Sequence, residues 1–154
     1  MANWLTQARS ELLGRLQADA TLGRLIATWY SWGAGLQQRY AVQPSACPFI
    51  SVVPAALDAE EIANAANGYD QDIEVGIGTD GQDCAPLEEI VATAVDILLA
   101  ARHDCLGLAA EGVAGVRILS LRWDPRPSED GARVIWLASI QVRISWIRLT
   151  TSGG

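Results

Sequence analysis

The chain has 154 residues, 50% of them apolar and 19% charged, and its formal net charge at pH 7 is −7. This size and apolar content predict one globular domain over residues 1–154 and exclude an intrinsically disordered chain. No apolar run approaches the roughly 20 residues of a membrane helix, and residues 1–4 do not have the pattern that begins a signal peptide. The excess of acidic residues disfavours sequence-specific nucleic-acid binding, for which a basic stripe is typical.

The N-terminal third predicts one helix followed by an ambiguous element. Apolar residues recur at helical spacing over residues 3–18, and Asn3 is in position to cap the start of that helix. Residues 25–32 suit either a short second helix or a strand. The glycines at the start of residues 33–44 indicate a loop.

The middle of the chain predicts two strands separated by a loop. Residues 49–53 are apolar and lie between two prolines, which is typical of a short strand. Residues 55–67, rich in Ala and Asn, predict a loop with at most one helical turn. Residues 69–78 alternate, so that one face carries Ile73, Val75 and Ile77 and the other carries Asp70, Asp72 and Glu74.

The C-terminal half predicts a helix and a long hairpin. Residues 86–103 have a broad apolar face, with acids in the first turn and an arginine in the last. Two strands, 116–123 and 133–148, are joined by the turn-rich residues 124–131. The fold class expected is α+β: a mainly antiparallel four-stranded sheet with helices packed on one face, in the order α-β-β-α-β-β.

The acids Asp70, Asp72 and Glu74 form the most ordered acidic surface in the sequence. They lie in residues 58–104, which carry twelve acids against one arginine. Neighbouring side chains on one strand face are roughly 6.5–7 Å apart, so these acids repel one another. A solvated face is the simplest interpretation; a functional acidic wall and a divalent-metal site are the alternatives.

The segment from Gly76 to Gly81 matches the G-x-G-x-x-G pattern that binds dinucleotide phosphates. Here Asp80 and Asp83 stand where a phosphate would sit and would repel it. A flexible turn between a strand and a helix is therefore the preferred interpretation. A small ligand-binding or enzymatic α+β domain with its site near this segment remains an alternative.

Cysteine and histidine usage argues against catalysis. The cysteines Cys47, Cys84 and Cys105 are scattered, with no C-x-x-C pair, which predicts reduced thiols and no zinc site. The single histidine, His103, lies at the end of a predicted helix, where a cation suits the helix dipole. We expect no catalytic residues, no metal and no cofactor.

The order of these elements resembles the tail terminator, or tail-to-head joining, proteins of long-tailed phages. The resemblance rests on the N-terminal helix, then CPFISVVP, YDQDIEVGIGTDG, the acid-started helix PLEEIVATAVDILL and the final strand RVIWLASIQVRISW. It covers about the full length. It implies a small α+β subunit of a ring, commonly a hexamer, at the head-proximal end of the tail, which ends tube growth and joins the tail to the head connector. It brings no catalytic residues.

The resemblance implies partners and a location. The partners would be other copies of the chain, the tail tube protein and head-tail connector proteins, with DNA passing through unbound and no membrane. The location would be the tail or neck of a virion assembled in the host cytoplasm. Another neck or tail-completion protein of the same virion is the alternative.

Two surfaces are candidates for function in such a ring. Ile135, Leu137 and Ile147 point away from the apolar face of the last strand, with Arg143 between them, and need a cover. A neighbouring subunit or the N-terminal helix would supply it. The acids Asp70, Asp72 and Glu74 are the candidate lumen-facing surface, because a wall of like charge keeps DNA mobile.

Overall fold

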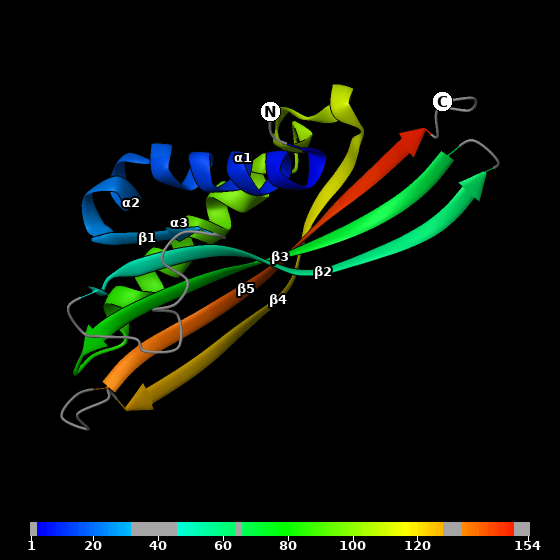
Figure 1. Ribbon diagram of the computed structural model, residues 1–154. Coiled ribbons are helices and arrows are strands. Elements are labelled where there is room, and N and C mark those ends of the chain that lie inside the picture. The colour runs from blue at the N-terminus through cyan, green and yellow to red at the C-terminus, as the bar shows by residue number, and fades with distance from the viewer. Residues whose placement is uncertain (1–2, 32–45, 64–65, 128–133, 150–154) are drawn as a thin grey trace.

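The computed structural model describes residues 3–31, 46–63, 66–127 and 134–149 (Figure 1). The helices and strands in chain order are α1 (Trp4–Ala18), α2 (Ala20–Leu25), β1 (Thr28–Ser31), β2 (Phe49–Ala63), β3 (Ala66–Gly81), α3 (Ala85–Ala101), β4 (Val113–Pro127) and β5 (Val134–Leu149). Two 3₁₀ turns, η3 (Cys105–Gly107) and η4 (Ala109–Glu111), connect α3 to β4. None of the described helices is long and apolar enough to cross a membrane.

The five strands form one mixed sheet in the order β1-β2-β3-β5-β4. β1 pairs with β2 in parallel, and every other neighbouring pair is antiparallel. The predicted four-stranded antiparallel sheet is therefore wrong. The missed strand is β1, four residues at the position where the sequence left helix and strand open, and its place in the sheet comes from pairing with distant residues 49–52.

The predicted loop over residues 55–67 is also wrong, because β2 continues to Ala63 and β3 begins at Ala66. Alanine and acidic residues have low strand propensity, which is why local composition suggested a loop. The two strands pair along nearly their whole length, with register shifts between Pro54 and Ala56 and between Glu61 and Ala63. Pairing across the hairpin therefore outweighs the local preference.

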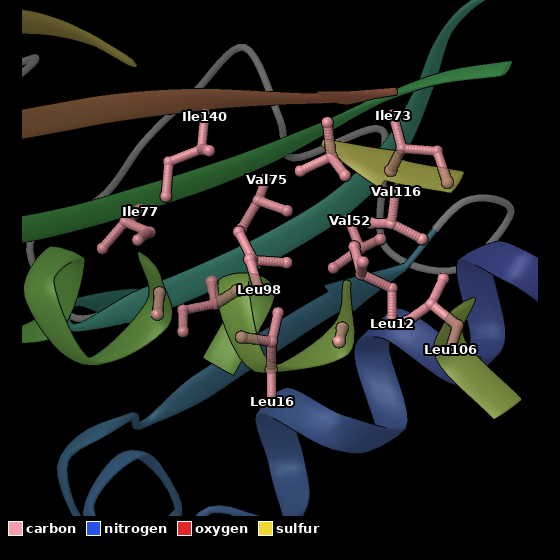
Figure 2. Close-up of a cluster of buried hydrophobic side chains, with 14 of the residues drawn as sticks. Leu12, Leu16, Val52, Ile73, Val75, Ile77, Leu98, Leu106, Val116 and Ile140 are labelled. Atoms are coloured by element: carbon pink, nitrogen blue, oxygen red, sulfur yellow. The ribbon is translucent and has the colours of Figure 1, made fainter. Parts of the chain in front are cut away.

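All three helices cover the same face of the sheet (Figure 1). Figure 2 shows Leu12 and Leu16 of α1 and Leu98 of α3 pointing toward strand residues that include Val52 and Ile140. Ile73, Val75 and Ile77 are fully buried in this core, as the alternation of β3 predicts. The opposite face of the sheet, turned away from the helices, is called the open face below.

Tryptophan and glutamine side chains tie α1 to the sheet. Asn3 accepts a hydrogen bond from the Thr6 backbone N–H at 2.9 Å, which confirms the predicted N-cap. The Gln71 amide donates to the Leu5 carbonyl at 2.8 Å and accepts from the Trp146 indole at 2.9 Å. These bonds satisfy the polar groups of a glutamine that lies in the core beneath the helix.

The glycine segment is strand and not the predicted flexible turn. Gly76 and Gly78 both lie inside β3, opposite Ser51 and Phe49 of β2. A Cβ atom at Gly78 would overlap the ring of Phe49, so the glycine provides the space on which that ring packs. The segment is paired backbone of a strand and not the strand-to-helix loop that a dinucleotide-phosphate site uses.

Candidate assembly surface

The open face brings together the two groups of residues that the sequence singled out. Asp72 of β3 is opposite Arg143 of β5, and Glu74 is opposite Gln141. The same alternation puts Ile135, Leu137 and Ile147 of β5 and Asp70 of β3 on this face. The predicted acidic wall and the predicted apolar interface are therefore neighbouring parts of one surface.

Arg143 is bound to the acids beside it. Its Nε and one Nη donate to the two carboxylate oxygens of Asp72 at 2.8 and 3.0 Å, and its other Nη lies 3.9 Å from Asp70. The Ser145 hydroxyl also donates to Asp70, at 3.2 Å. The hydrogen-bonded carboxylate of Asp72 raises the pKa of Arg143 above its ordinary value, although partial burial opposes this shift. Asp72 is only 7% exposed, so it is a neutralised partner of Arg143.

The four predicted interface residues differ in what they offer a partner. Ile135 is 2% exposed and Leu137 is half-buried, while Arg143 is held by Asp72. Ile147 is 47% exposed. Helix α1 does not cover these residues, because its buried side chains belong to the core on the opposite face. The suggestion that the N-terminal helix is their cover is therefore wrong.

Acids predominate on one half of the open face and arginines on the other. The register of the sheet places acids on β2 and β3 (Asp58, Glu60, Asp70, Asp72, Glu74, Asp80) and arginines on β4 and β5 (Arg117, Arg122, Arg126, Arg143), with Asp124 of β4 paired to Arg126 among the arginines. Sequence reasoning found the acids and missed the stripe of arginines on β4. The spacing of Arg122 and Arg126, four residues apart, already places both on one face of a strand. The sequence does not show that this face and the acids of β3 lie on the same side of the sheet.

Two strand edges have no strand beside them among the described residues. β4 is the last strand of the sheet along its whole length. On the other side, β1 pairs with Phe49–Val52 only, so the outer edge of β2 carries no partner strand from Pro54 onward. Trp123 of β4 is 51% exposed and Leu57 of β2 is 46% exposed. Unpaired edges with exposed apolar side chains are surfaces on which another chain can add a strand.

A groove of about 500 Å³ lies beside the β2 edge. Leu5, Thr6 and Arg9 of α1 form one wall, and Pro54 to Leu57 form the other. The groove is on the helix side of the sheet, because Gln71, which also lines it, belongs to that side. It is an open, mainly apolar depression directly next to the edge strand.

The described residues hold no group of three or more His, Cys, Asp or Glu side chains placed to bind a metal ion. None of the three cysteines forms a disulfide. Burial, with a smaller effect from Asp80, raises the pKa of the Cys47 thiol to about 11. A hydrogen bond to the Glu88 carboxylate raises the pKa of Cys84. Both shifts favour the thiol over the reactive thiolate.

Comparison with known proteins found a likeness in fold. No protein-family model matches the chain, and no curated protein matches it. Among solved structures, it is similar to a chain described as part of the virion of a native gene transfer agent particle, with 18% sequence identity and a TM-score of 0.56. The match covers 94% of this chain and 99% of the other, so the likeness concerns the whole fold.

Proposed function

We propose that this chain is a structural protein of a phage-like virion. The observation that carries the proposal is the fold shared with a virion chain over nearly the full length of both molecules. Two strand edges that carry no partner strand from the described part of the chain, and the unequal charges on the two halves of the open face, support assembly with further copies. A structural protein works through such surfaces and needs no catalytic group.

Within the virion, the role we propose is that of a tail terminator. Six copies of the chain close into a ring at the head-proximal end of the tail. The ring ends growth of the tail tube and joins it to the head connector, and assembly takes place in the host cytoplasm. The resemblance of the sequence along its full length supports this role, and another neck or tail-completion protein is the competing assignment.

The open face has two parts in this proposal. Of the three predicted lumen acids, Asp70 and Glu74 face the channel of the ring, and Asp72 lies on the same face but is paired with Arg143; the helices are on the outside. Apolar residues near both ends of β5 contact neighbouring proteins of the tail or neck: Ile147, near the end of the strand, is the most exposed of them, and Leu137 and Ile135 lie near its start. Replacing Ile147 by Asp should weaken assembly and leave the folded subunit intact, because about half of that residue is exposed in the single chain.

Deletion of the gene from a strain that makes the particles tests the role. A terminator is needed to stop the tube, so its loss should give tubes of uncontrolled length without heads, seen by electron microscopy. Adding the purified chain to such extracts should restore tubes of normal length. Tubes of normal length that fail to join heads would identify another neck protein. A full set of normal particles would overturn the virion proposal itself.

A further inference from the structure

We propose that neighbouring subunits of the ring join edge to edge, with β4 of one copy adding to β2 of the next. In this pairing Arg122 lies opposite Asp58, and Trp123 lies opposite Leu57. The inference rests on the proposed function, because it requires a ring of identical chains. It names a surface and a register that the ring proposal by itself does not contain.

Strand direction allows this pairing. β2 is antiparallel to β3, β3 to β5 and β5 to β4, so β4 runs opposite to β2. When a second copy is placed in the same orientation beside the first, its β2 is therefore antiparallel to the β4 that it meets. Rotation about a ring axis keeps that orientation, so each copy uses both edges once. The contact is head-to-tail, which is what closure into a ring requires.

Proline and the short strand β1 limit where the two edges can pair. β1 occupies the β2 edge over residues 49–52, and Pro54 lacks the N–H that a ladder bond needs. On β4, Pro125 and Pro127 interrupt the edge in the same way. These features limit both edges at one end of the ladder. Register shifts between Ile118 and Ser120 of β4 and between Glu61 and Ala63 of β2 limit the other end, which leaves residues 120–124 and 56–60. Both stretches have five residues, enough for a short strand ladder.

Charge and exposure select one register within this window. Arg122 and Asp58 both belong to the open face and both are exposed. When they are opposite each other, Trp123 and Leu57 become opposite partners on the helix side, and both are large exposed apolar side chains. Cross-strand pairs of opposite charge and of large apolar groups are the pairs that stabilise a sheet.

The neighbouring registers lose these pairs. A shift that moves Arg122 opposite Glu60 puts Asp124 opposite Asp58, and like charges face each other. A shift the other way puts Arg122 opposite Ala56 and leaves Asp58 opposite Ser120. A shift by one residue would turn the two open faces to opposite sides of the joined sheet. The register with Arg122 opposite Asp58 is the one that keeps both contacts.

In the proposed pairing, the groove beside β2 of one copy receives Trp123 of the next copy. Trp123 points to the helix side at the β4 edge, and Leu57 forms part of the groove on the helix side at the β2 edge. In the joined sheet the indole of one copy lies against Leu57 and Leu5 of the next. Burying an indole that is half exposed in the single chain removes apolar surface from water and gives the contact an anchor.

Charge reversal with rescue tests the pairing in the full-length protein. Mass in solution is measured by light scattering and rings are counted by electron microscopy, for the wild type, Arg122→Glu, Asp58→Arg and the double variant. Each single change should weaken ring formation by about tenfold or more, since it places like charges across the contact. The double variant should recover rings. Arg102→Glu changes an exposed residue just after α3 and alters the net charge as much as Arg122→Glu does. This control variant should form rings as the wild type does.

Cross-linking tests the apolar half of the contact separately. Chains carrying Trp123→Cys are mixed with chains carrying Leu57→Cys under mild oxidation, and the linked peptides are identified by mass spectrometry. A disulfide joining positions 123 and 57 of different chains is expected, because opposite residues in a ladder bring their Cα atoms within the roughly 4.4–6.8 Å that the bond needs. Mixing Trp123→Cys with Leu99→Cys, an exposed position on α3, should give no such link.

The outcomes of these experiments distinguish the strand pairing from the ring proposal on which it rests. A wild-type chain that stays monomeric, alone and with tail tubes, overturns the ring and the pairing together. Wild-type rings that persist in Arg122→Glu, or that never give the 123–57 link, overturn the pairing and leave the ring proposal standing. Loss of rings in both single variants, recovery in the double variant and the expected link support the pairing.

Discussion

Arg143 shows how the role of a residue depends on the strand beside it. In the sequence it lies between apolar residues on the solvent side of the last strand, and this pattern predicts that it takes part in a subunit interface. In the structure its guanidinium makes two hydrogen bonds to Asp72 of the adjacent strand and lies near Asp70. It therefore compensates the least exposed carboxylate of the open face inside its own subunit.

Replacing Arg143 by Met should lower the free energy of unfolding by about 2 kcal/mol, because Asp72 would keep a poorly hydrated charge without a partner. Urea denaturation measures the change. The double variant Arg143→Met with Asp72→Asn should recover most of it, since no uncompensated charge remains. If Arg143→Met costs no more than Arg102→Met, whose side chain is exposed, the ion pair does not stabilise the fold.

Cys47 should react with alkylating agents far more slowly than an ordinary thiol. Its pKa of about 11 exceeds the ordinary value of 9.0, so at pH 8 the thiolate fraction is about a hundredfold lower than that of an ordinary thiol. The alkylation rate of the Cys84→Ser, Cys105→Ser variant should keep rising with pH beyond 9, be half-maximal near pH 11 and level off only above that. A rate that is half-maximal near pH 9 would contradict the shift.

At the scale of elements, β3 is the strand on which the other parts of the sheet depend. It pairs with β2 on one side and β5 on the other, and its helix-side residues Ile73, Val75 and Ile77 enter the core. Its open face combines acids with two glycines that make room for β2 side chains. The glycines that resembled a phosphate loop are therefore a packing feature of a central strand.

The variant Gly78→Ala should destabilise the fold by roughly 1–3 kcal/mol, because the added methyl group overlaps the ring of Phe49 and one of them must move. Thermal unfolding measures the effect. Gly115→Ala in β4 is the matched control, since nothing lies within 4 Å of its added Cβ, and it should be neutral or slightly stabilising. Equal stability of the two variants would show that Phe49 does not pack on Gly78.

At the scale of the whole molecule, the sheet divides its two faces between different tasks. The helix side holds the core, and the open face carries acids on β2 and β3 and arginines on β4 and β5. In the proposed ring the β4 arginines meet the β2 acids of the next copy, while the β3 acids remain toward the channel. Under this proposal the acids and arginines at the edges make the contact between copies, and the acids of β3 repel the DNA in the channel.

Reversing Asp70 and Glu74 to Arg should leave particles assembled and reduce the delivery of their DNA, because the channel wall would bind phosphates that must move past it. Asp72 is left unchanged, since its loss would uncouple Arg143. Delivery is measured as the number of cells that receive a marker gene, divided by the number of particles counted by electron microscopy. The variant Asp70→Asn with Glu74→Gln, which removes the charges without adding cations, should show a smaller defect. Normal transfer by the Arg variant would contradict a channel-facing position.

Local patterns in the sequence were sufficient for several elements. The helical repeat over residues 3–18 and the cap at Asn3 predicted α1, the alternation over residues 69–78 predicted the two faces of β3, and residues 86–103 predicted α3. The strand over residues 133–148 was found for the same reason. In each case the information lies within one element, because side-chain periodicity is a property of the local backbone.

Tertiary structure decided the rest, because strand pairing joins residues that are far apart in the chain. β1 belongs to the sheet through its contact with residues 49–52, and residues 55–63 are strand through their pairing with β3. The partnership of Arg143 with Asp72 and the shared face of the β2 acids and β4 arginines follow from cross-strand register. The sequence by itself determined which residues are apolar, charged or capping; only the folded sheet decided which of them meet, since register is set by distant strands and not by neighbouring residues.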